Sequence, residues 1–244
     1  MITAGEIFQA WDEAPLSDVA AITAGGPTLV LAPHPDDESL GFGGLIATAA
    51  ARGETIEVAV LTDGAGSHPN SRQYPPARLK QLRAAETIAA LAELDVTPNH
   101  VTFLEAPDAA APHHGPAFAV FLARIETLVH ARAIRTILTT WRHDPHCDHE
   151  AAALLAMAAT RATGARLWFA PVWGWTLPAA TALPEPAGEA LRLDITARLP
   201  AKRRAIASHV SQTTALITDS PDPFRLEDKF LALFDRPWEV FIRP

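Results

Sequence analysis

Cysteine and tyrosine are almost absent from this chain: its 244 residues include one of each, Cys147 and Tyr74. A single cysteine excludes an internal disulfide framework, and this usage is typical of proteins from a reducing compartment. The fold must therefore be stabilised by a buried core. Hydrophobic residues make up 48% of the sequence, which is enough for a sizeable core in a chain of this length.

Long hydrophobic runs and an excess of positive charge are also lacking. No segment approaches the roughly 20 apolar residues needed to cross a bilayer, and residues 1–12 lack the basic start and apolar stretch of a secretory signal. We therefore expect a cytoplasmic protein without a transmembrane segment. The formal net charge is −8, and a negative surface disfavours nucleic acid and anionic membranes as partners. Of the partner classes considered, a small molecule is the one that the composition favours, and the sequence is compatible with a homo-oligomer.

Short apolar runs alternate along the chain with longer segments of helical spacing. The runs that predict strands cover residues 28–32, 54–62, 101–104, 134–139, 167–172, 191–195 and 239–242. The segments that predict helices cover residues 45–51, 77–94, 117–131, 150–163 and 201–211. Such alternation is typical of an α/β fold. We predict a single-domain, Rossmann-like three-layer α/β/α sandwich with a mostly parallel sheet over residues 1–244.

Two stretches rich in proline, alanine and glycine, 106–116 and 177–189, predict long surface loops. In parallel sheets, ligands bind where loops leave the carboxyl ends of the strands. These loops are therefore candidates for the rim of a site.

A cluster of polar residues directly follows the first predicted strand, where residues 33–44 read PHPDDESLGFGG. One imidazole and three consecutive carboxylates at the end of a strand would repel one another unless a cation compensated them. Imidazole and carboxylate together form a ligand set that suits zinc. The alternative is an acidic turn that caps the next helix, but His34 in front and the glycines behind favour a metal site.

A second cluster follows the fourth predicted strand, where residues 141–150 read WRHDPHCDHE. His146 and His149 are three positions apart and share a face if a helix begins there. The positive end of that helix would favour negative charge nearby. These residues could instead only cap the helix, but two such clusters at strand ends favour a catalytic site. We assign no role to His143.

At these two segments the sequence resembles the PIG-L/LmbE-like family of zinc-dependent N-deacetylases. That family includes the N-acetylglucosaminyl-phosphatidylinositol deacetylase and the deacetylases of mycothiol and bacillithiol synthesis. His34 to Glu38 match the family's His-Pro-Asp-Asp-Glu segment, and His146 to His149 match its His-x-Asp-His segment. Weaker matches extend the resemblance over residues 27–242; they are Thr62-Asp63-Gly64, Arg83 with Glu86, Pro107-Asp108, Lys202, His209 and Ser211-Gln212.

The resemblance implies a cofactor and the residues that hold it. Carried over by position, the family's Zn²⁺ ligands fall on His34, Asp37 and His149. Three protein ligands leave one coordination position open, which is the pattern of catalytic zinc. Another divalent metal is compatible with the same ligands. Asp36 matches the general base that takes a proton from water.

The remaining matches concern the leaving group and the substrate. His146 corresponds to the residue that, as imidazolium, stabilises the oxyanion or protonates the leaving amine, and Asp148 would orient it. Asp108 lies where family members contact a sugar hydroxyl. Arg83 is a weaker candidate for substrate binding, because an Arg-x-x-Glu pair on a helix can be a simple ion pair. Cys147 stands where the family commonly has proline, and we expect it to point away from His149.

We therefore predict a zinc-dependent hydrolase that removes an N-acyl group, most simply acetyl, from an amino sugar or its conjugate. The alternatives are a zinc amidohydrolase for a non-sugar, lipid-linked or antibiotic-linked amide, and an inactive sugar- or nucleotide-binding module.

The segment Gly41-Phe42-Gly43-Gly44 lacks the Gly-x-Gly-x-x-Gly spacing of a dinucleotide site. Trp173 and Trp175 could stack on a sugar or fill the core.

Overall fold

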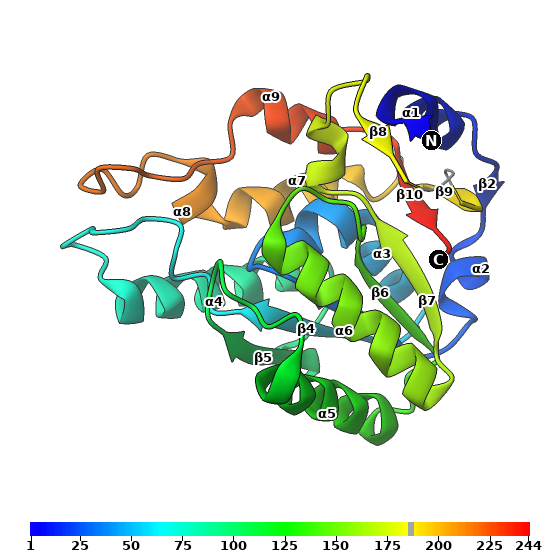
Figure 1. Cartoon of the computed structure of the whole chain (residues 1–244), viewed down its shortest axis with the longest axis horizontal. Helices are drawn as coiled ribbons and strands as arrows, with labels where there is room; N and C mark the ends of the chain where they lie inside the picture. Colours follow the sequence, from blue (N-terminus) through cyan, green and yellow to red (C-terminus); the bar gives the residue numbers. More distant parts are fainter. Residues whose placement is uncertain (185–187) are drawn as a thin grey trace.

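The computed structural model describes residues 1–184 and 188–244. A sheet of eight strands runs through the molecule in the order β2-β9-β10-β7-β6-β3-β4-β5 (Figure 1). Its parallel part consists of β3 (Thr28–Ala32), β4 (Ile56–Thr62), β5 (Val101–Ala106), β6 (Thr136–Thr140) and β7 (Arg166–Ala170). The antiparallel β10 (Trp238–Ile242) joins this part to β9 (Ala190–Asp194) and the short β2 (Leu16–Ser17). A separate pair is formed by β1 (Ile2–Thr3) and β8 (Ala182–Leu183).

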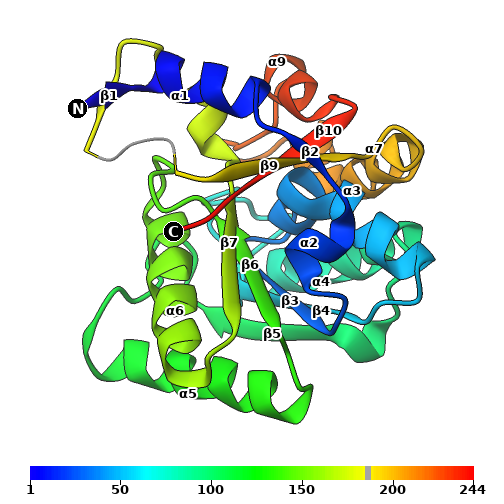
Figure 2. The ribbon, with the colours of Figure 1, turned by 90° about the vertical axis from the view of Figure 1, so that its right-hand side faces the viewer.

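Helices cover both faces of the sheet (Figure 2). One face carries α3 (Asp37–Ala51), α4 (Pro76–Glu93), α7 (Leu199–Ser208) and the short α2 (Val19–Thr23). The other face carries α5 (Gly115–Ala131), α6 (Cys147–Thr163) and α1 (Ala4–Asp12). Shorter elements are α8 (Val210–Thr213), α9 (Asp228–Leu231), η1 (Pro98–His100), η2 (Trp173–Thr176) and η3 (Ala232–Phe234).

The central strand β3 shows why the sheet needs both helical layers. All five of its residues are buried. Because side chains alternate along a strand, Leu29 and Leu31 enter the core under α5 and α6, whereas Val30 enters the core under α3. A strand that is apolar on both faces is typical of the middle of a parallel sheet. The predicted three-layer α/β fold with a mostly parallel sheet is confirmed.

Two predicted helices have different limits in the structure. The helix predicted over 45–51 begins at Asp37, so the glycine-rich stretch is helical, and the predicted start was wrong. The helix predicted over 201–211 is interrupted at His209, whose ψ of 60° is not helical. The predicted loop 106–116 joins β5 to α5, while the predicted loop 177–189 includes β8, and residues 185–187 lie outside the described residues.

A buried carboxylate contacts the glycine-rich middle of α3. Glu239 on β10 accepts hydrogen bonds from the backbone N–H groups of Gly44 and Leu45, at 2.7 and 2.8 Å. It also accepts one from Nζ of Lys202 on α7, at 2.7 Å. These bonds tie the middle of α3 to its neighbours. The glycines therefore reflect close packing of a helix rather than a loop.

The parallel pairing of β3 with β6 positions the two sequence clusters. Leu31 lies opposite Thr139, so both strands end at the same edge of the sheet. The loop after β3 leads into α3, and the loop after β6 leads into α6. Residues more than 100 positions apart in the sequence therefore meet at one place. No helix within residues 1–184 and 188–244 has the length and apolar character required to traverse a bilayer.

We predict that Gly44→Ala destabilises the protein. A Cβ at this position would lie 2.5, 2.6 and 2.7 Å from the Cγ2, Cδ1 and Cβ atoms of Ile195. Alanine favours a helix over glycine by about 1 kcal/mol, but overpacking costs about 1–3 kcal/mol, so we expect a net loss of up to about 2 kcal/mol in the free energy of unfolding. Urea denaturation measures it.

The control is the same change in an Ile195→Ala background. There the methyl group would meet fewer atoms, and Gly44→Ala should cost less. An equal cost in both backgrounds would show that contact with Ile195 is not the cause.

Candidate active site

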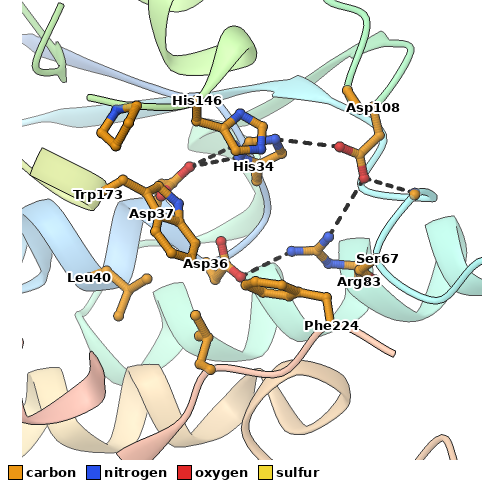
Figure 3. A pocket seen from close by; sticks show the side chains of 14 residues that line it. His34, Asp36, Asp37, Leu40, Ser67, Arg83, Asp108, His146, Trp173 and Phe224 are labelled. Atoms are coloured by element: carbon orange, nitrogen blue, oxygen red, sulfur yellow. Dashed lines mark hydrogen bonds and ion pairs between the residues drawn. The ribbon is translucent and has the colours of Figure 1, made fainter. Parts of the chain in front are cut away.

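A cavity of about 340 Å³ opens at the carboxyl ends of β3 and β6 (Figure 3). Six of the eight predicted site residues line it: His34, Asp36, Asp37, Arg83, Asp108 and His146. The other two, Asp148 and His149, are completely buried at the start of α6. The structure therefore brings together residues from four separate segments of the chain.

Three of these residues direct acceptor atoms toward one another. Oδ2 of Asp37 lies 3.2 Å from Nδ1 of His34 and 3.2 Å from Nε2 of His149. Ligand atoms bound tetrahedrally to zinc at about 2.0–2.1 Å would be separated by about 3.3 Å. The spacing of the two imidazole nitrogens from the carboxylate therefore fits a shared divalent cation.

The opposite nitrogen of each imidazole faces a carboxylate. Nε2 of His34 lies 3.0 Å from Oδ2 of Asp148, and Nδ1 of His149 lies 2.9 Å from Oδ2 of Asp144. A neutral imidazole that donates to these carboxylates keeps its lone pair on the nitrogen that faces Asp37. Carboxylates in this position orient histidine ligands and raise their basicity.

An unsatisfied buried atom supports the same interpretation. Nε2 of His149 is buried, and its 3.2 Å approach to Oδ2 of Asp37 lacks the geometry of a hydrogen bond, so the atom has no hydrogen-bond partner among the described residues. A buried acceptor left without a partner costs free energy. A cation bound by His34, Asp37 and His149 would accept the lone pair of Nε2 of His149. It would also offset the repulsion between the lone pairs of the three ligand atoms. The donor set therefore fits the metal that the sequence predicts.

Other groups of ligand atoms also lie within 4.8 Å of one another in the described chain. These groups are His34 with His146 and His149, His34 with Asp108 and Asp148, and His146 with Cys147 and Asp148. Asp108 and Asp148 both face the nitrogen of His34 that acts as a donor, so they form a hydrogen-bonded cluster. Cys147 is exposed, with its Sγ 3.6 Å from the carbonyl oxygen of Ala109. Two of the predicted ligands, His34 and His149, belong to the first of these groups.

The charges of this cluster are strongly coupled. Burial alone would lower the pKa of His149, but the carboxylates of Asp37 and Asp144 outweigh it and raise the pKa to about 9. Burial would likewise raise the pKa of Asp37, yet His149 and His34 hold it well below its ordinary value. The site therefore stabilises an ionised Asp37 and positive charge beside it, which a metal ion would supply.

Asp36 lies next to the predicted metal ligands in a strained conformation. Its φ of 144° is one that residues other than glycine rarely adopt, at a cost of about 1–3 kcal/mol. Its backbone N–H donates to Oε2 of Glu38 at 3.0 Å, and its Oδ2 accepts from Arg83 at 3.0 Å. These bonds hold the carboxylate in the cavity. Such strain is common at functional sites.

The surroundings of Asp36 suit a general base. Burial and the negative charge of Asp37 raise the pKa of Asp36 to about 6, although the charge of Arg83 acts in the opposite direction. A base with a pKa near the working pH is ionised yet still accepts a proton effectively. The position and the pKa of Asp36 are therefore consistent with the role that the sequence predicts.

Arg83 acts on Asp36 and on the backbone around it. Its guanidinium donates to the carbonyl oxygens of Gly64 and Pro35 at 3.0 and 2.7 Å, besides the bond to Asp36. The predicted partner in a possible ion pair, Glu86, instead accepts two hydrogen bonds from Ser211. Arg83 is therefore a positioning residue that borders the cavity.

His146 begins α6 and also lines the cavity. Its Nδ1 accepts the backbone N–H of Asp148 at 3.2 Å, so the residue does cap the helix. Burial and the neighbouring His34 and His149 lower the pKa of His146 to about 4. These neighbours disfavour the imidazolium form of His146, and a neutral ring whose Nδ1 accepts this bond carries its proton on Nε2. The role of His146 as an imidazolium stays a prediction.

The side chain of Asp148 has a different partner from the one expected. It contacts His146 only through its backbone N–H, whereas its carboxylate lies against His34 and accepts the N–H groups of Ala109 and Ala111 at 2.7 and 2.9 Å. The carboxylate of Asp148 therefore orients a predicted metal ligand. This arrangement also fixes the loop that carries Asp108.

Asp108 forms the polar side of the cavity. One oxygen lies 3.4 Å from Nε2 of His34, and the other accepts the N–H of Gly66 at 2.8 Å. Burial would raise the pKa of Asp108, but His34, Arg83 and the bond from Gly66 hold it below its ordinary value. Asp108 is therefore an ionised acceptor, suited to the hydroxyl groups of a sugar.

The two tryptophans near the site have different surroundings. Trp173 lines the cavity, where its ring centroid lies 5.9 Å from that of Phe224. Trp175 packs on Trp11 and Phe8, with ring centroids 5.1 and 5.5 Å apart. One tryptophan therefore lines the site and the other fills the core.

Two structurally important carboxylates were not assigned from the sequence. Asp144 accepts the backbone N–H groups of residues 172, 173 and 174 in addition to the bond with His149. Glu38 bonds Nε2 of His209 at 2.8 Å, and both side chains are buried. Glu38 lies inside the first motif, and Asp144 lies two positions before the second. His209 and residues 172–174 are distant from these carboxylates in the sequence, which leaves no local signal for those contacts.

Comparison with solved structures identifies the same fold. The A40926 pseudoaglycone deacetylase matches with a TM-score of 0.68 and 21% identity, over 88% of this chain and 96% of that chain. N,N'-diacetylchitobiose deacetylase from Pyrococcus horikoshii matches with a TM-score of 0.66 and 20% identity, over 99% and 92%. The 4-carboxy-2-hydroxymuconate hydratase from Pseudomonas putida matches with a TM-score of 0.60 and 22% identity, over 75% and 78%.

These identities establish the fold alone, and no curated protein matches the sequence. The family is shown by the sequence profile described as PIG-L, GlcNAc-PI de-N-acetylase, which matches residues 29–160. The match covers more than half of the 244 residues and includes both motif segments. The chain belongs to the PIG-L family of de-N-acetylases.

Proposed function

We propose that this protein is a zinc-dependent N-deacetylase that acts on an N-acetyl amino sugar or its conjugate. The proposal rests on one observation: the lone pairs of His34, Asp37 and His149 meet beside Asp36 in an open cavity. Membership of the PIG-L family and the deacetylases among the structural neighbours support the reaction. Asp108 on the cavity wall supports a hydroxyl-bearing substrate.

His34, Asp37 and His149 would hold the metal. A divalent zinc ion supplies a Lewis acid for the acyl oxygen and lowers the pKa of water from about 15.7 to about 7. The protein contributes the orientation of these ligands through Asp148 and Asp144.

Asp36 moves the proton during attack. Its carboxylate accepts a proton from the water whose oxygen bonds to the acyl carbon. Arg83 keeps that carboxylate in place with its 3.0 Å hydrogen bond. A pKa of about 6 leaves Asp36 ionised near pH 7 before this step.

His146 stabilises the negative acyl oxygen. Its Nδ1 is occupied by the backbone N–H of Asp148, so Nε2 carries the proton and can donate to the oxyanion. A donor that is fixed before the reaction stabilises developing charge effectively.

The amine leaves with a proton. When the carbon–nitrogen bond breaks, the nitrogen needs a proton, and protonated Asp36 is the acid in the cavity that can return it. The products are a free carboxylate and a free amino group, and Asp36 is again ionised.

We predict release of free amine from N-acetylglucosamine derivatives, with loss of activity in a chelator and recovery when zinc is restored. Fluorescamine labelling of the product amine, with elemental analysis of the protein, measures both. Amine release that persists after complete metal removal would contradict the metal requirement. Absence of release from every N-acetyl amino sugar tested would contradict the substrate class.

We predict that Asp36→Asn retains zinc but loses about 10²–10⁴-fold in kcat, because an amide cannot accept the proton from water. His149→Ala should lose zinc instead, because one of its three ligands is missing. Zinc content and turnover of the purified variants separate the two effects. Near-normal turnover by zinc-loaded Asp36→Asn would rule out Asp36 as the base.

We predict that Asp144→Asn weakens zinc binding about 10- to 100-fold, because the bond that orients His149 loses its charge. Competition with a chromogenic chelator measures the affinity. Glu150→Gln is the matched control, since this exposed carboxylate directly follows His149 on α6. An unchanged zinc affinity in Asp144→Asn would show that zinc binding does not require the charged hydrogen bond between Asp144 and His149.

We predict that His146→Ala keeps zinc and lowers kcat about 10²–10³-fold, the usual loss when one oxyanion donor is removed. His146→Gln should recover part of the loss, because its amide can donate a similar hydrogen bond. Steady-state kinetics and zinc analysis measure these effects. Equal turnover in wild type and His146→Ala would exclude His146 as the donor.

A further inference from the structure

A second, larger cavity lies beside the catalytic one and has an apolar lining. Its volume is about 580 Å³, within the range of cavities that bind small molecules. The apolar groove, as we call it, takes its apolar lining from Trp173, Phe224, Leu226, Phe230 and Leu233. The cavity is also lined by Thr176, Pro223, Arg225, Glu227 and Lys229. Trp173 and Phe230 stack with ring centroids 4.5 Å apart. These side chains come from η2 and from the segment that leads into α9 and η3.

The apolar groove adjoins the catalytic cavity. Trp173, Phe224 and Leu226 line both spaces. Figure 3 shows Trp173 and Phe224 around the catalytic carboxylates, with Asp108 on a different side of the cavity from Trp173. The two spaces are therefore neighbours that share these three side chains.

Hydrogen bonds hold the segment of Phe224 in place. The N–H of Phe224 donates to the carbonyl oxygen of Ser67 at 2.8 Å, and the N–H of Leu226 donates to that of Gln212 at 2.9 Å. Upstream, Asp219 accepts hydrogen bonds from the loop after β4, including one from Oγ of Ser71 at 2.6 Å. The wall between the two spaces is therefore preformed, as in most small-molecule sites.

The two sides of the catalytic cavity differ in polarity. One side presents Asp108 and the backbone of Gly66, which suit the hydroxyl groups of an amino sugar. Another presents Leu40 and Trp173, next to the apolar groove. An amide joins an amine half to an acyl half, so its cleavage point lies between two different chemical groups. If the sugar occupies the polar side, the acyl group points toward the apolar one.

We propose that the apolar groove binds the acyl chain of the substrate, and that the enzyme accepts medium-chain N-acyl amino sugars in addition to the N-acetyl form. This inference rests on the proposed function for the reaction itself. The acyl chain would run past Trp173 and Phe224 toward Leu233. Each methylene buried in this way should raise kcat/KM about fourfold until the groove is filled.

The test compares two series of substrates. In the first, the acyl group of N-acyl glucosamine grows from acetyl to octanoyl; in the second, the acyl group stays acetyl and an alkyl glycoside grows from methyl to octyl. We expect kcat/KM to rise at least about tenfold along the first series and to stay flat along the second. A rise only along the second would assign the groove to the aglycone and overturn the proposal. A rise along neither would also overturn it.

A pair of variants ties the effect to the groove. Leu233→Gln places a polar group in it and should reduce the ratio of octanoyl to acetyl kcat/KM at least about fivefold. Leu231→Gln is the matched control, because Leu231 is also partly buried on the same segment but does not line the groove. If the ratio of octanoyl to acetyl kcat/KM were the same in Leu233→Gln and Leu231→Gln, the proposal would be overturned.

Binding separates this inference from the proposed function. Calorimetric titration of Asp36→Asn with N-octanoyl and N-acetyl glucosamine measures affinity without turnover. Tighter binding of the octanoyl compound with no hydrolysis by wild type would support the groove and contradict the deacylase function. Hydrolysis of the acetyl compound with equal affinity for both would support the function and contradict the groove.

Discussion

Parallel pairing of β3 with β6, with Leu31 opposite Thr139, brings two loops to the same edge of the sheet. One loop contributes an imidazole and a carboxylate, and the other contributes a second imidazole at the start of α6. Their lone pairs face one another at 3.2 Å, an arrangement that is unfavourable without positive charge between them. The hydrogen bonds around the site serve to keep these atoms in this arrangement.

Those hydrogen bonds come from widely separated parts of the chain. Asp148 and Asp144 orient the two imidazoles, and Arg83 and Glu38 fix Asp36 from opposite sides. Asp144 and Asp148 also bind backbone N–H groups of the neighbouring loops. The groups that position the reacting residues therefore also fix the loops that shape the cavity. The hydratase with the same fold indicates that such a scaffold is not restricted to one reaction.

Sequence alone predicted the alternation of strands and helices, because a strand such as β3, apolar on both faces, has few alternatives to a covered parallel sheet. It also predicted the residues that meet at the site, because both motifs are short and local. It missed the helical start of α3, since glycines in a helix are justified only by a close neighbour, here Ile195. It misassigned the partner of the Asp148 carboxylate, because that contact spans 114 positions.

The residues of the proposed chemistry and the residues of the apolar groove lie in different parts of the sequence. Residues 29–160 contain every group assigned to the proposed chemistry, whereas Trp173, Phe224 and Leu233 follow this region. In the part of the chain that the structure describes, the C-terminal third borders the cavity through its apolar wall, contacts Glu38 through His209 and donates backbone N–H groups to Asp144. Evolution can therefore alter substrate choice in one stretch of sequence while leaving the hydrolytic residues untouched, and relatives that share both motifs need not share a substrate.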